Sequence, residues 1–319
     1  MAVYTDVAFD DLEALLAGYD IGTPRSFKGI AEGVENSNFI LQTDRGNFIL
    51  TLYEKRVSAD DLPFFLGLLD HLSSRRVPCP VPIPNRLGHK WTTVNRRPAA
   101  ILSWLDGLSL QYPEASHCAA AGLALAELHA GGADFPITRT NSLGPSGWAA
   151  LADATISRAN SVQAGLSELI ASTLAEMQRS WPTNLRSGIV HADLFPDNVL
   201  FMDGKVSGLI DFYFACNDAY AYDLAIMLNA WCFEIDGKYN PAKGRSLVTA
   251  YCEKRPLDPA EMATLPVLAT GAALRFLLTR LHDWLDQDPT ALVRPKDPRE
   301  FARRLVFHRS VKDVTEYGV

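Results

Sequence analysis

Gly188–Asn198 reads Gly-Ile-Val-His-Ala-Asp-Leu-Phe-Pro-Asp-Asn, and the rest of the 319-residue chain is interpreted outward from this stretch. Its first three residues are an apolar run that predicts a buried strand, and Val199–Phe201 directly after it predicts another. A third predicted strand, Val206–Ile210, follows an Asp-Gly turn and ends at Asp211. Two carboxylates and a carboxamide therefore stand at the ends of short strands, which is a layout suited to phosphoryl transfer.

The spacing His-x-Asp-x-x-x-x-Asn is that of a kinase catalytic loop, and Asp211 occupies the place of a metal-binding aspartate. In such a loop Asp193 accepts the proton of the acceptor hydroxyl, while Asn198 and Asp211 hold Mg²⁺ on the ATP phosphates. Taken singly, each of these residues is also typical of a plain turn. We assign His191 a structural role, in which it packs and hydrogen-bonds to hold the loop.

The stretch His191–Asn198 resembles the H-G-D-x-H-P-x-N motif of aminoglycoside phosphotransferase-like kinases, and Ile210–Phe212 resembles their I-D-F/W. This resemblance implies a bilobal, protein-kinase-like α+β fold, with a small antiparallel β N-lobe, a mostly helical C-lobe, and ATP and Mg²⁺ as cofactors. Other segments are more narrowly similar to the bacterial homoserine kinases of that superfamily, which implies L-homoserine as the phosphate acceptor: Gly33–Phe39, Phe48–Glu54, Asp223–Ile226 and Asn229–Cys232.

The composition is that of an ordinary soluble globular protein, with 48% hydrophobic and 21% charged residues. A net charge of −7 gives no basic footprint for a nucleic-acid partner. No apolar run approaches the length of a membrane span, and the N-terminus lacks the pattern of a signal peptide. The cysteines are odd in number and scattered, which fits free thiols in the cytoplasm: Cys79, Cys118, Cys216, Cys232 and Cys252.

A capping box at Asp10–Glu13 predicts a helix near the N-terminus, and three strands follow at Ser26–Ala31, Asn38–Thr43 and Asn47–Tyr53. The loop between the first two strands would cover the ATP phosphates in a kinase. Taken alone, its composition favours a plain β-turn, but its place before a hairpin in a chain with a catalytic loop supports the phosphate-covering role. Its candidate nucleotide-binding residues are Glu35, Asn36, Ser37 and Asn38.

A protein kinase carries a lysine in the third strand, but Thr51 occupies that position here. The next predicted helix, Ser58–Ser74, contains no glutamate that could pair with such a lysine. Lys28 and Lys55 are near in sequence, and solvated surface lysines are the simpler interpretation of both.

Proline at alternating positions makes Val77–Pro84 a rigid connector rather than a helix or a central strand. The strands Trp91–Asn95 and Ala99–Trp104 follow. In a kinase-like fold the second leads into the hinge, where backbone groups of Leu102, Ser103 and Trp104 would hold the adenine edge. A strand without any ligand would have the same sequence. We therefore expect an N-lobe at residues 1–104 and a C-lobe at residues 105–319.

The C-lobe is expected to be mostly helical. Asp223 resembles the family aspartate that anchors the helix after the metal loop, and we assign it a structural role. The expected helices are Ala119–His129, Ser161–Arg179, Tyr222–Phe233, Pro241–Glu253, Pro259–Leu285 and Pro298–His308.

The charge of the C-terminal region distinguishes between an aminoglycoside and homoserine as the phosphate acceptor. Residues 231–319 hold 12 Asp and Glu against 14 Lys and Arg, so this region is not the acidic cleft that a polycationic aminoglycoside requires. Homoserine is a zwitterion, and arginine binds a carboxylate through two parallel hydrogen bonds. Arg275 and Arg280 on an apolar helix are therefore candidates for the substrate carboxylate, although an internal salt bridge is an equal alternative for each. Asn229 and Trp231 are weaker candidates.

Two other functions stay open: a kinase for choline, methylthioribose or an aminoglycoside, and a catalytically inactive kinase-like binding module. The presence of Asp193, Asn198 and Asp211 together argues against the inactive module. We expect a cytoplasmic monomer or homodimer whose partner is its small-molecule substrate.

Overall fold

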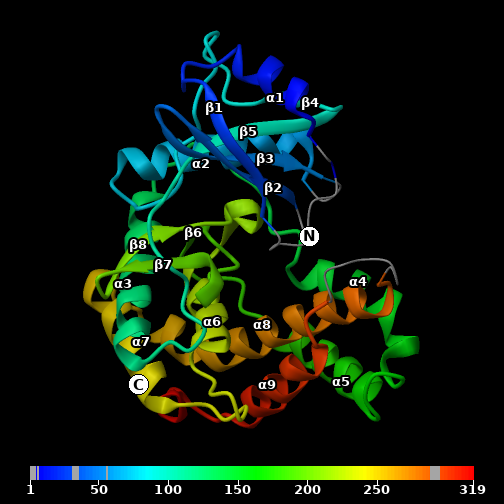
Figure 1. Cartoon of the computed structure of the whole chain (residues 1–319). Helices are drawn as coiled ribbons and strands as arrows, with labels where there is room; N and C mark the ends of the chain where they lie inside the picture. The colour runs from blue at the N-terminus through cyan, green and yellow to red at the C-terminus, as the bar shows by residue number, and fades with distance from the viewer. Residues whose placement is uncertain (1–4, 6, 31–35, 55–56, 288–294) are drawn as a thin grey trace. The chain divides into compact units, whose positions relative to one another are not determined.

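The computed structural model describes residues 5, 7–30, 36–54, 57–287 and 295–319. The chain divides into two compact units, Met1–Gly107 and Leu108–Val319, which are called unit 1 and unit 2. Unit 1 is built on an antiparallel sheet, whereas helices dominate unit 2 (Figure 1).

The sheet of unit 1 has five strands in the order β1-β2-β3-β5-β4, and all neighbours are antiparallel. A two-residue turn joins β2 to β3, because Thr43 pairs with Gly46. Gly46 has a φ of 146°, a backbone conformation that glycine adopts without strain. The strands are β1 (Pro24–Gly29), β2 (Asn36–Thr43), β3 (Gly46–Tyr53), β4 (Thr92–Val94) and β5 (Arg97–Ser103).

The helix α1 (Phe9–Leu16) packs on one face of this sheet. Alternation along the strands brings one set of apolar side chains to that face, where they form a core with Leu12 and Leu16. The predicted capping box is wrong, because the N-cap residue is Ala8, two residues before Asp10, and the helix begins at Phe9 without a side-chain cap. The core includes Phe39, Leu41, Leu50, Leu52, Ala99 and Ile101.

The predicted helix at Ser58–Ser74 is a short 3₁₀ turn, Ala59–Asp61, followed by α2 (Leu62–Ser74). The proline-rich connector then runs along β5: the N–H of Ile83 donates to the carbonyl of Ile101, and the N–H of Ser103 donates to the carbonyl of Val81. Prolines are tolerated there because the connector lies at the edge of the sheet.

Within the part of the chain that the structure describes, unit 2 contains seven α-helices and two small antiparallel sheets of two strands each. β6 (Ser187–Val190) pairs with β9 (Cys216–Ala219), and β7 (Val199–Met202) pairs with β8 (Lys205–Leu209). The helices are α3 (Ala115–Gly131), α4 (Pro145–Ala159), α5 (Leu166–Ser180), α6 (Tyr220–Trp231), α7 (Pro241–Lys254), α8 (Pro259–Leu285) and α9 (Pro298–Ser310).

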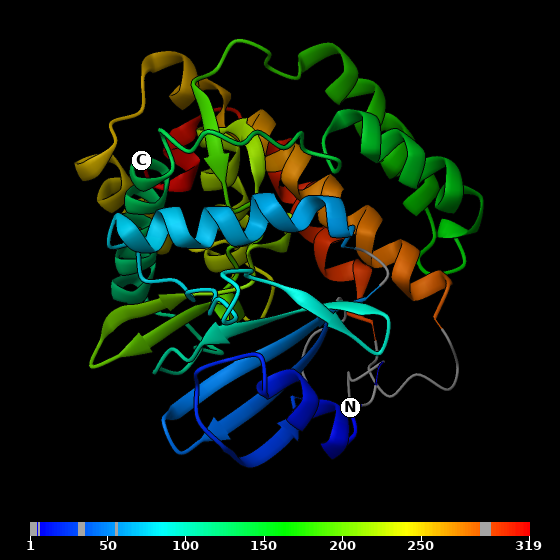
Figure 2. The same ribbon diagram turned by 90° about the horizontal axis from the view of Figure 1, so that it is seen from above.

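The long helix α8 is the centre of unit 2, since α4, α5, α6 and α9 all pack against it (Figures 1 and 2). It is long and apolar enough to span a membrane by length and composition, so the expectation that no such segment exists does not hold on those criteria. However, 67% of its most apolar window is buried inside the structure. Its apolar composition is therefore that of a core helix.

Candidate active site

The two small sheets of unit 2 bring the catalytic motif and the metal motif together. His191 directly follows β6, and Asn198 directly precedes β7. The register of the β7–β8 hairpin pairs Val199 with Leu209, and the N–H of Ile210 donates to the carbonyl of Asn198 over 3.0 Å. Asn198 and Asp211 consequently lie at the same end of one hairpin, as the sequence predicted from the strand ends.

Hydrogen bonds with Asp223 and Arg275 hold the backbone around Ala192. Ala192 has a φ of 61°, in the left-handed region that residues with a side chain seldom adopt. Asp223 accepts the N–H of His191 over 2.7 Å and the N–H of Ala192 over 2.8 Å. The guanidinium of Arg275 donates to the carbonyl of Ala192. These contacts hold a strained conformation directly before Asp193.

Asp223 is fully buried and is itself braced. His129 Nε2 lies 3.1 Å from its Oδ2, and His129 Nδ1 lies 2.9 Å from the hydroxyl of Tyr251. Burial alone would raise the pKa of Asp223, but hydrogen bonds from His129 and from the backbone, with the neighbouring imidazoles, lower it overall. Asp223 therefore serves the loop as an ionised acceptor.

His191 connects the catalytic loop to the metal loop. Its Nε2 lies 3.0 Å from the carbonyl of Ile210, and its ring packs against Phe212. Its Nδ1 accepts the N–H of Asp193 over 3.3 Å. Burial lowers the pKa of His191, which favours the neutral ring that this pair of contacts needs.

The pKa of the Asp193 carboxyl is far above its ordinary value. Desolvation raises its pKa to about 8, and the charges of Asp211 and Asp197 act in the same direction, whereas Arg275 and Lys296 oppose them. Asn198 Nδ2 donates to the backbone carbonyl of Asp193 over 2.8 Å and lies 3.4 Å from its Oδ2. A pKa near neutrality is typical of a residue that exchanges a proton during catalysis.

The donor set fits a hard divalent cation. Asp211 also has a left-handed backbone, with φ 65° and ψ 58°, at the step from β8 into a 3₁₀ turn. Because the amide nitrogen of Asn198 is engaged at Asp193, the amide oxygen is the atom it can offer to a metal. A carboxylate and an amide oxygen are ligands that Mg²⁺ accepts, with phosphate oxygens and waters completing its shell. No cluster of three His, Cys, Asp or Glu within the described residues forms an all-protein metal site.

The two candidates on α6 are engaged in packing. Trp231 is buried, and its indole N–H donates to the carbonyl of Leu194 over 2.8 Å, so it braces the catalytic loop. Asn229 is buried between two helices, where its Nδ2 donates to the carbonyls of Ala225 and Ala269, each over 3.0 Å.

The two arginines of α8 have different environments. Arg275 is 1% exposed, and besides its bond to Ala192 it lies over the rings of Phe214 and Phe276. Arg280 is paired with Glu300 of α9 over 2.5 Å, which is the internal salt bridge that the sequence left open.

Sequence reasoning did not identify Lys296. This residue lies shortly before α9, and its Nζ is 3.0 Å from Asp197 Oδ2 in the catalytic loop. Its ammonium is 5.7 Å from the centre of the Phe195 ring. It is 99 residues from Asp197 in sequence, so no local motif could have revealed it.

Of the predicted phosphate-contacting residues, Asn36, Ser37 and Asn38 lie on β2 of unit 1, and Glu35 lies outside the described residues. Because successive side chains of a strand point to opposite faces of the sheet, these three do not all face the same way. Ser37 pairs with Leu52, and its Oγ donates to Glu54 over 2.7 Å. Asn38 pairs with Thr51, whose hydroxyl donates to Asn38 Oδ1 over 2.7 Å. Ser37 therefore points to the sheet face that α1 covers, whereas Asn36 and Asn38 point to the opposite face.

Thr51 occupies the position of the lysine that a protein kinase carries in its third strand, and Glu54 is a buried carboxylate shortly after it. Thr51 is buried and hydrogen-bonded, and Lys28 is exposed, whereas Lys55 lies outside the described residues. Glu54 is buried and lies 3.3 Å from the guanidinium of Arg97. At the end of β5, the N–H and hydroxyl of Ser103 both bond to Val81, and Trp104 donates its indole N–H to Asp106 over 2.9 Å.

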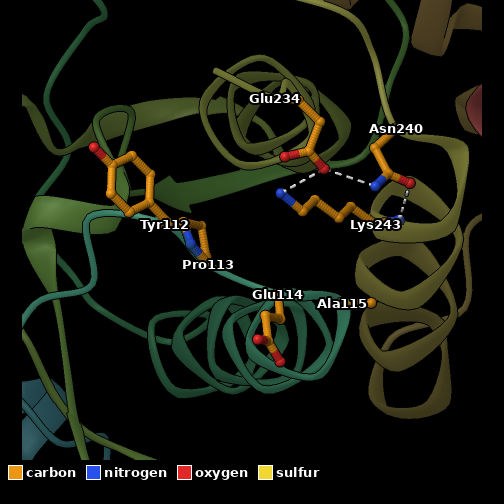
Figure 3. Close-up of a pocket in the computed structure, with 7 residues that line it drawn as sticks. All are labelled: Tyr112, Pro113, Glu114, Ala115, Glu234, Asn240 and Lys243. Carbon is orange, nitrogen blue, oxygen red and sulfur yellow. Dashed lines mark hydrogen bonds and ion pairs between the residues drawn. The ribbon is translucent and has the colours of Figure 1, made fainter. Parts of the chain in front are cut away.

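A pocket of about 370 Å³ lies elsewhere in unit 2 (Figure 3). Lys243 Nζ is 2.9 Å from Glu234, and Asn240 donates to the same carboxylate over 2.7 Å, so these polar groups satisfy one another. None of the predicted site residues lines it. Its lining is Tyr112, Pro113, Glu114, Ala115, Glu234, Asn240 and Lys243.

The chain is similar in sequence to known phosphotransferases. The model of the phosphotransferase enzyme family matches residues 26–265. A homoserine kinase from Xanthobacter autotrophicus is 56% identical over 319 residues, covering 100% of this chain and 99% of the relative. A homoserine kinase from Rhodospirillum rubrum is 58% identical with the same coverage.

Solved structures share the fold at low identity. An amicoumacin kinase in complex with AMP-PNP, Ca²⁺ and its antibiotic superposes with a TM-score of 0.70 at 15% identity, covering 95% of this chain and 92% of the other. A spectinomycin phosphotransferase in complex with ADP and spectinomycin gives a TM-score of 0.70 at 12% identity, covering 98% of both chains. The predicted fold class, an aminoglycoside phosphotransferase-like α+β architecture, is confirmed.

Proposed function

Because the chain belongs to the phosphotransferase enzyme family, we propose that it is a homoserine kinase that transfers the γ-phosphoryl group of ATP to L-homoserine. The observation that carries the proposal is an identity of 56–58% with homoserine kinases along the whole chain. The arrangement of Asp193, Asn198 and Asp211 supplies the groups that such a reaction needs. The product, O-phospho-L-homoserine, would serve threonine biosynthesis in the cytoplasm, and we expect a monomer or homodimer.

Asp193 orients the acceptor hydroxyl and takes its proton. The phosphoryl group passes through a loose transition state, so positioning and charge neutralisation supply most of the catalysis. Burial raises the pKa of this carboxyl, which makes the ionised form a stronger base than an ordinary aspartate for accepting the proton late in the transfer. The hydrogen bonds to the backbone of Ala192 fix the position of the Asp193 carboxyl relative to the β7–β8 hairpin.

Asn198 and Asp211 would hold Mg²⁺, which neutralises charge on the ATP phosphates when it is bound. We assign contacts with the phosphates to Asn36 and Asn38, and we retain Glu35 as an untested candidate. The bond from Ser37 to Glu54 favours a role in holding the start of β2 instead. The adenine edge is assigned to backbone groups of Leu102, Ser103 and Trp104; the amide of Ser103 already has a partner, which makes Trp104 the better donor.

The contacts on α6 and α8 change the assignment of the substrate residues. Arg275 and Trp231 bond to backbone carbonyls of the catalytic loop, so we assign them to positioning Asp193. Asn229 and Arg280 hold helices together in unit 2. The carboxylate of the acceptor therefore needs a different cation.

A coupled ADP-release assay with purified protein tests the function directly. We expect the highest kcat/KM with L-homoserine and a requirement for Mg²⁺, in a panel that also contains choline, methylthioribose and kanamycin. A clear preference for any of the other three acceptors, or no turnover with homoserine, would overturn the proposal.

A further inference from the structure

Lys296 and Asp197 form an exposed pair of opposite charges at the loop that carries Asp193. Lys296 Nζ lies 3.0 Å from Asp197 Oδ2, and the two side chains are 63% and 58% exposed. We propose that this pair receives the head group of an α-amino-acid acceptor, with Lys296 binding its carboxylate and Asp197 binding its ammonium group. The inference rests on the proposed function and assigns residues for the substrate that this function names.

Three observations relate the pair to the loop that carries the catalytic carboxyl. Asp197 belongs to the same loop as Asp193 and directly precedes the metal-binding candidate Asn198. Lys296 lies over the ring of Phe195, which is also in this loop. The charges of both Asp197 and Lys296 act on the Asp193 carboxyl. A head group bound at the pair would consequently keep the acceptor hydroxyl near Asp193.

The charges match the ligand. A zwitterionic amino acid presents one anion and one cation on neighbouring atoms, so it needs a cation and an anion that lie close together. An exposed ion pair contributes little to folding stability, because water screens it. Opening the pair around a zwitterion replaces one charge contact with two, and neither Lys296 nor Asp197 is left without a partner.

Other cations of the neighbourhood are already committed. Arg275 donates to the backbone of the catalytic loop, and Arg280 and Arg304 both pair with Glu300. Moving Arg275 to a substrate would leave the buried carbonyl of Ala192 unsatisfied, and moving Arg280 or Arg304 would break a salt bridge to Glu300 that holds α9, which is costly. Lys296 carries no such penalty, since its partner Asp197 is exposed to water.

Truncated acceptors separate the two contacts. 4-Hydroxybutanoate keeps the carboxylate of homoserine but lacks the ammonium group, and 3-aminopropan-1-ol keeps the ammonium group but lacks the carboxylate. Affinity is measured as KM for an acceptor that is phosphorylated, and as Ki against homoserine for one that is not. Each is measured with the wild type, Lys296→Met and Asp197→Asn.

We expect Lys296→Met to weaken homoserine and 4-hydroxybutanoate by about 10- to 100-fold, the range of one charge-assisted hydrogen bond, and to leave 3-aminopropan-1-ol unchanged. Asp197→Asn should weaken homoserine and 3-aminopropan-1-ol and leave 4-hydroxybutanoate unchanged. The KM for ATP should stay within a factor of about three in both variants, because neither residue is assigned to the nucleotide.

Lys238→Met is the matched control. It removes a surface lysine that also lies 3.0 Å from an aspartate, Asp236, on the segment before α7, and it should change none of these constants. If neither Lys296→Met nor Asp197→Asn changes the homoserine KM, or if each weakens all three acceptors equally, the assignment of the pair is wrong. If the wild type does not phosphorylate homoserine, the proposed function fails first and the assignment falls with it.

Discussion

The two sides of the catalytic loop are held by different kinds of interaction. On the buried side, Asp223, Arg275 and Trp231 bind backbone groups of residues 191–194, and His129 braces Asp223 in turn. On the exposed side, Asp197 forms a salt bridge with the solvent-accessible ammonium of Lys296. Groups that must not move are fixed by buried bonds, and groups that would exchange partners with an acceptor face water.

The energetic consequences of the two sides differ for the same reason. Removing one partner from a buried charged network leaves the other uncompensated and costs about 3–5 kcal/mol. An exposed ion pair contributes about 0–1 kcal/mol, so its loss is almost silent in a stability measurement. Substitutions on the two sides should therefore be distinguishable by what they change. The predictions below run from the largest expected effect to the smallest.

The largest effect is expected at Asp193, which lies in the loop between the buried residues 191–192 and the exposed Asp197. Asp193→Asn removes the base but keeps the size of the side chain, so turnover with homoserine should fall by about 10²–10⁴-fold. Because no buried partner is lost, the unfolding midpoint should change little, and ATP binding measured by calorimetry should persist. Wild-type turnover in this variant would remove Asp193 from the mechanism.

Breaking the buried side should destabilise unit 2. Asp223→Ala leaves two backbone N–H groups and His129 without their acceptor, so the free energy of unfolding should fall by about 3–5 kcal/mol. Urea unfolding followed by tryptophan fluorescence reports on this unit, which contains Trp148, Trp181, Trp231 and Trp284. Lys296→Met is the exposed-side counterpart, and a similar loss in that variant would contradict the comparison.

A milder change on the buried side should affect catalysis more than binding. Arg275→Lys keeps the charge but loses the planar group that reaches the Ala192 carbonyl and lies over Phe276. A small displacement of Asp193 should lower kcat about 10-fold, while the homoserine KM stays within a factor of about three.

Arg280→Lys is the control on the same helix, because its partner is Glu300 rather than the loop, and its kcat should stay near that of the wild type. If Arg275→Lys instead raises the homoserine KM with an unchanged kcat, Arg275 binds the substrate carboxylate as first expected from the sequence.

The pH dependence of stability is the smallest effect. Burial lowers the pKa of His129 and His191 on the buried side, and it lowers the pKa of His308 on α9 to about 3. Below about pH 6.5 the unfolded chain binds protons that these folded imidazoles do not, so stability should fall as the pH falls from 6.5 toward 3. Each such histidine contributes up to about 1.4 kcal/mol per pH unit.

His308→Asn can keep a hydrogen bond with Tyr317 but cannot titrate. The slope of unfolding free energy against pH between 6 and 5 should decrease by about one proton in this variant. Lys296→Met should keep the wild-type slope, because this variant removes none of the buried imidazoles. An unchanged slope in His308→Asn would show that His308 is protonated in the folded protein.

The sequence predicted the parts of the molecule that depend on local pattern. The bounds of α8 follow from the capping aspartate and proline at its start, and the observed range, Pro259–Leu285, is the predicted one. The placement of Asn198 and Asp211 at one hairpin end followed from two short strands and a glycine turn.

Features that depend on distant segments were missed. The helix α4 was not predicted, because only one of its regularly spaced buried residues, Trp148, is a large apolar side chain, and the short polar strand β9 gave no apolar run. The different partners of Arg275 and Arg280 could not be inferred, because two arginines on one apolar helix have the same local pattern. Lys296 reaches the loop only through the packing of α9.

The hydrogen bonds that Asp223, Arg275 and Trp231 make on the buried side of the catalytic loop all go to the main chain: Asp223 and Arg275 at residues 191 and 192, and Trp231 at the Leu194 carbonyl. Main-chain groups are the same whichever residue carries them. The side chains of the loop and its exposed neighbours can therefore change over evolutionary time while the geometry at Asp193 persists. An architecture of this kind can acquire new acceptors by substitutions at its rim, with the phosphoryl-transfer apparatus inherited intact.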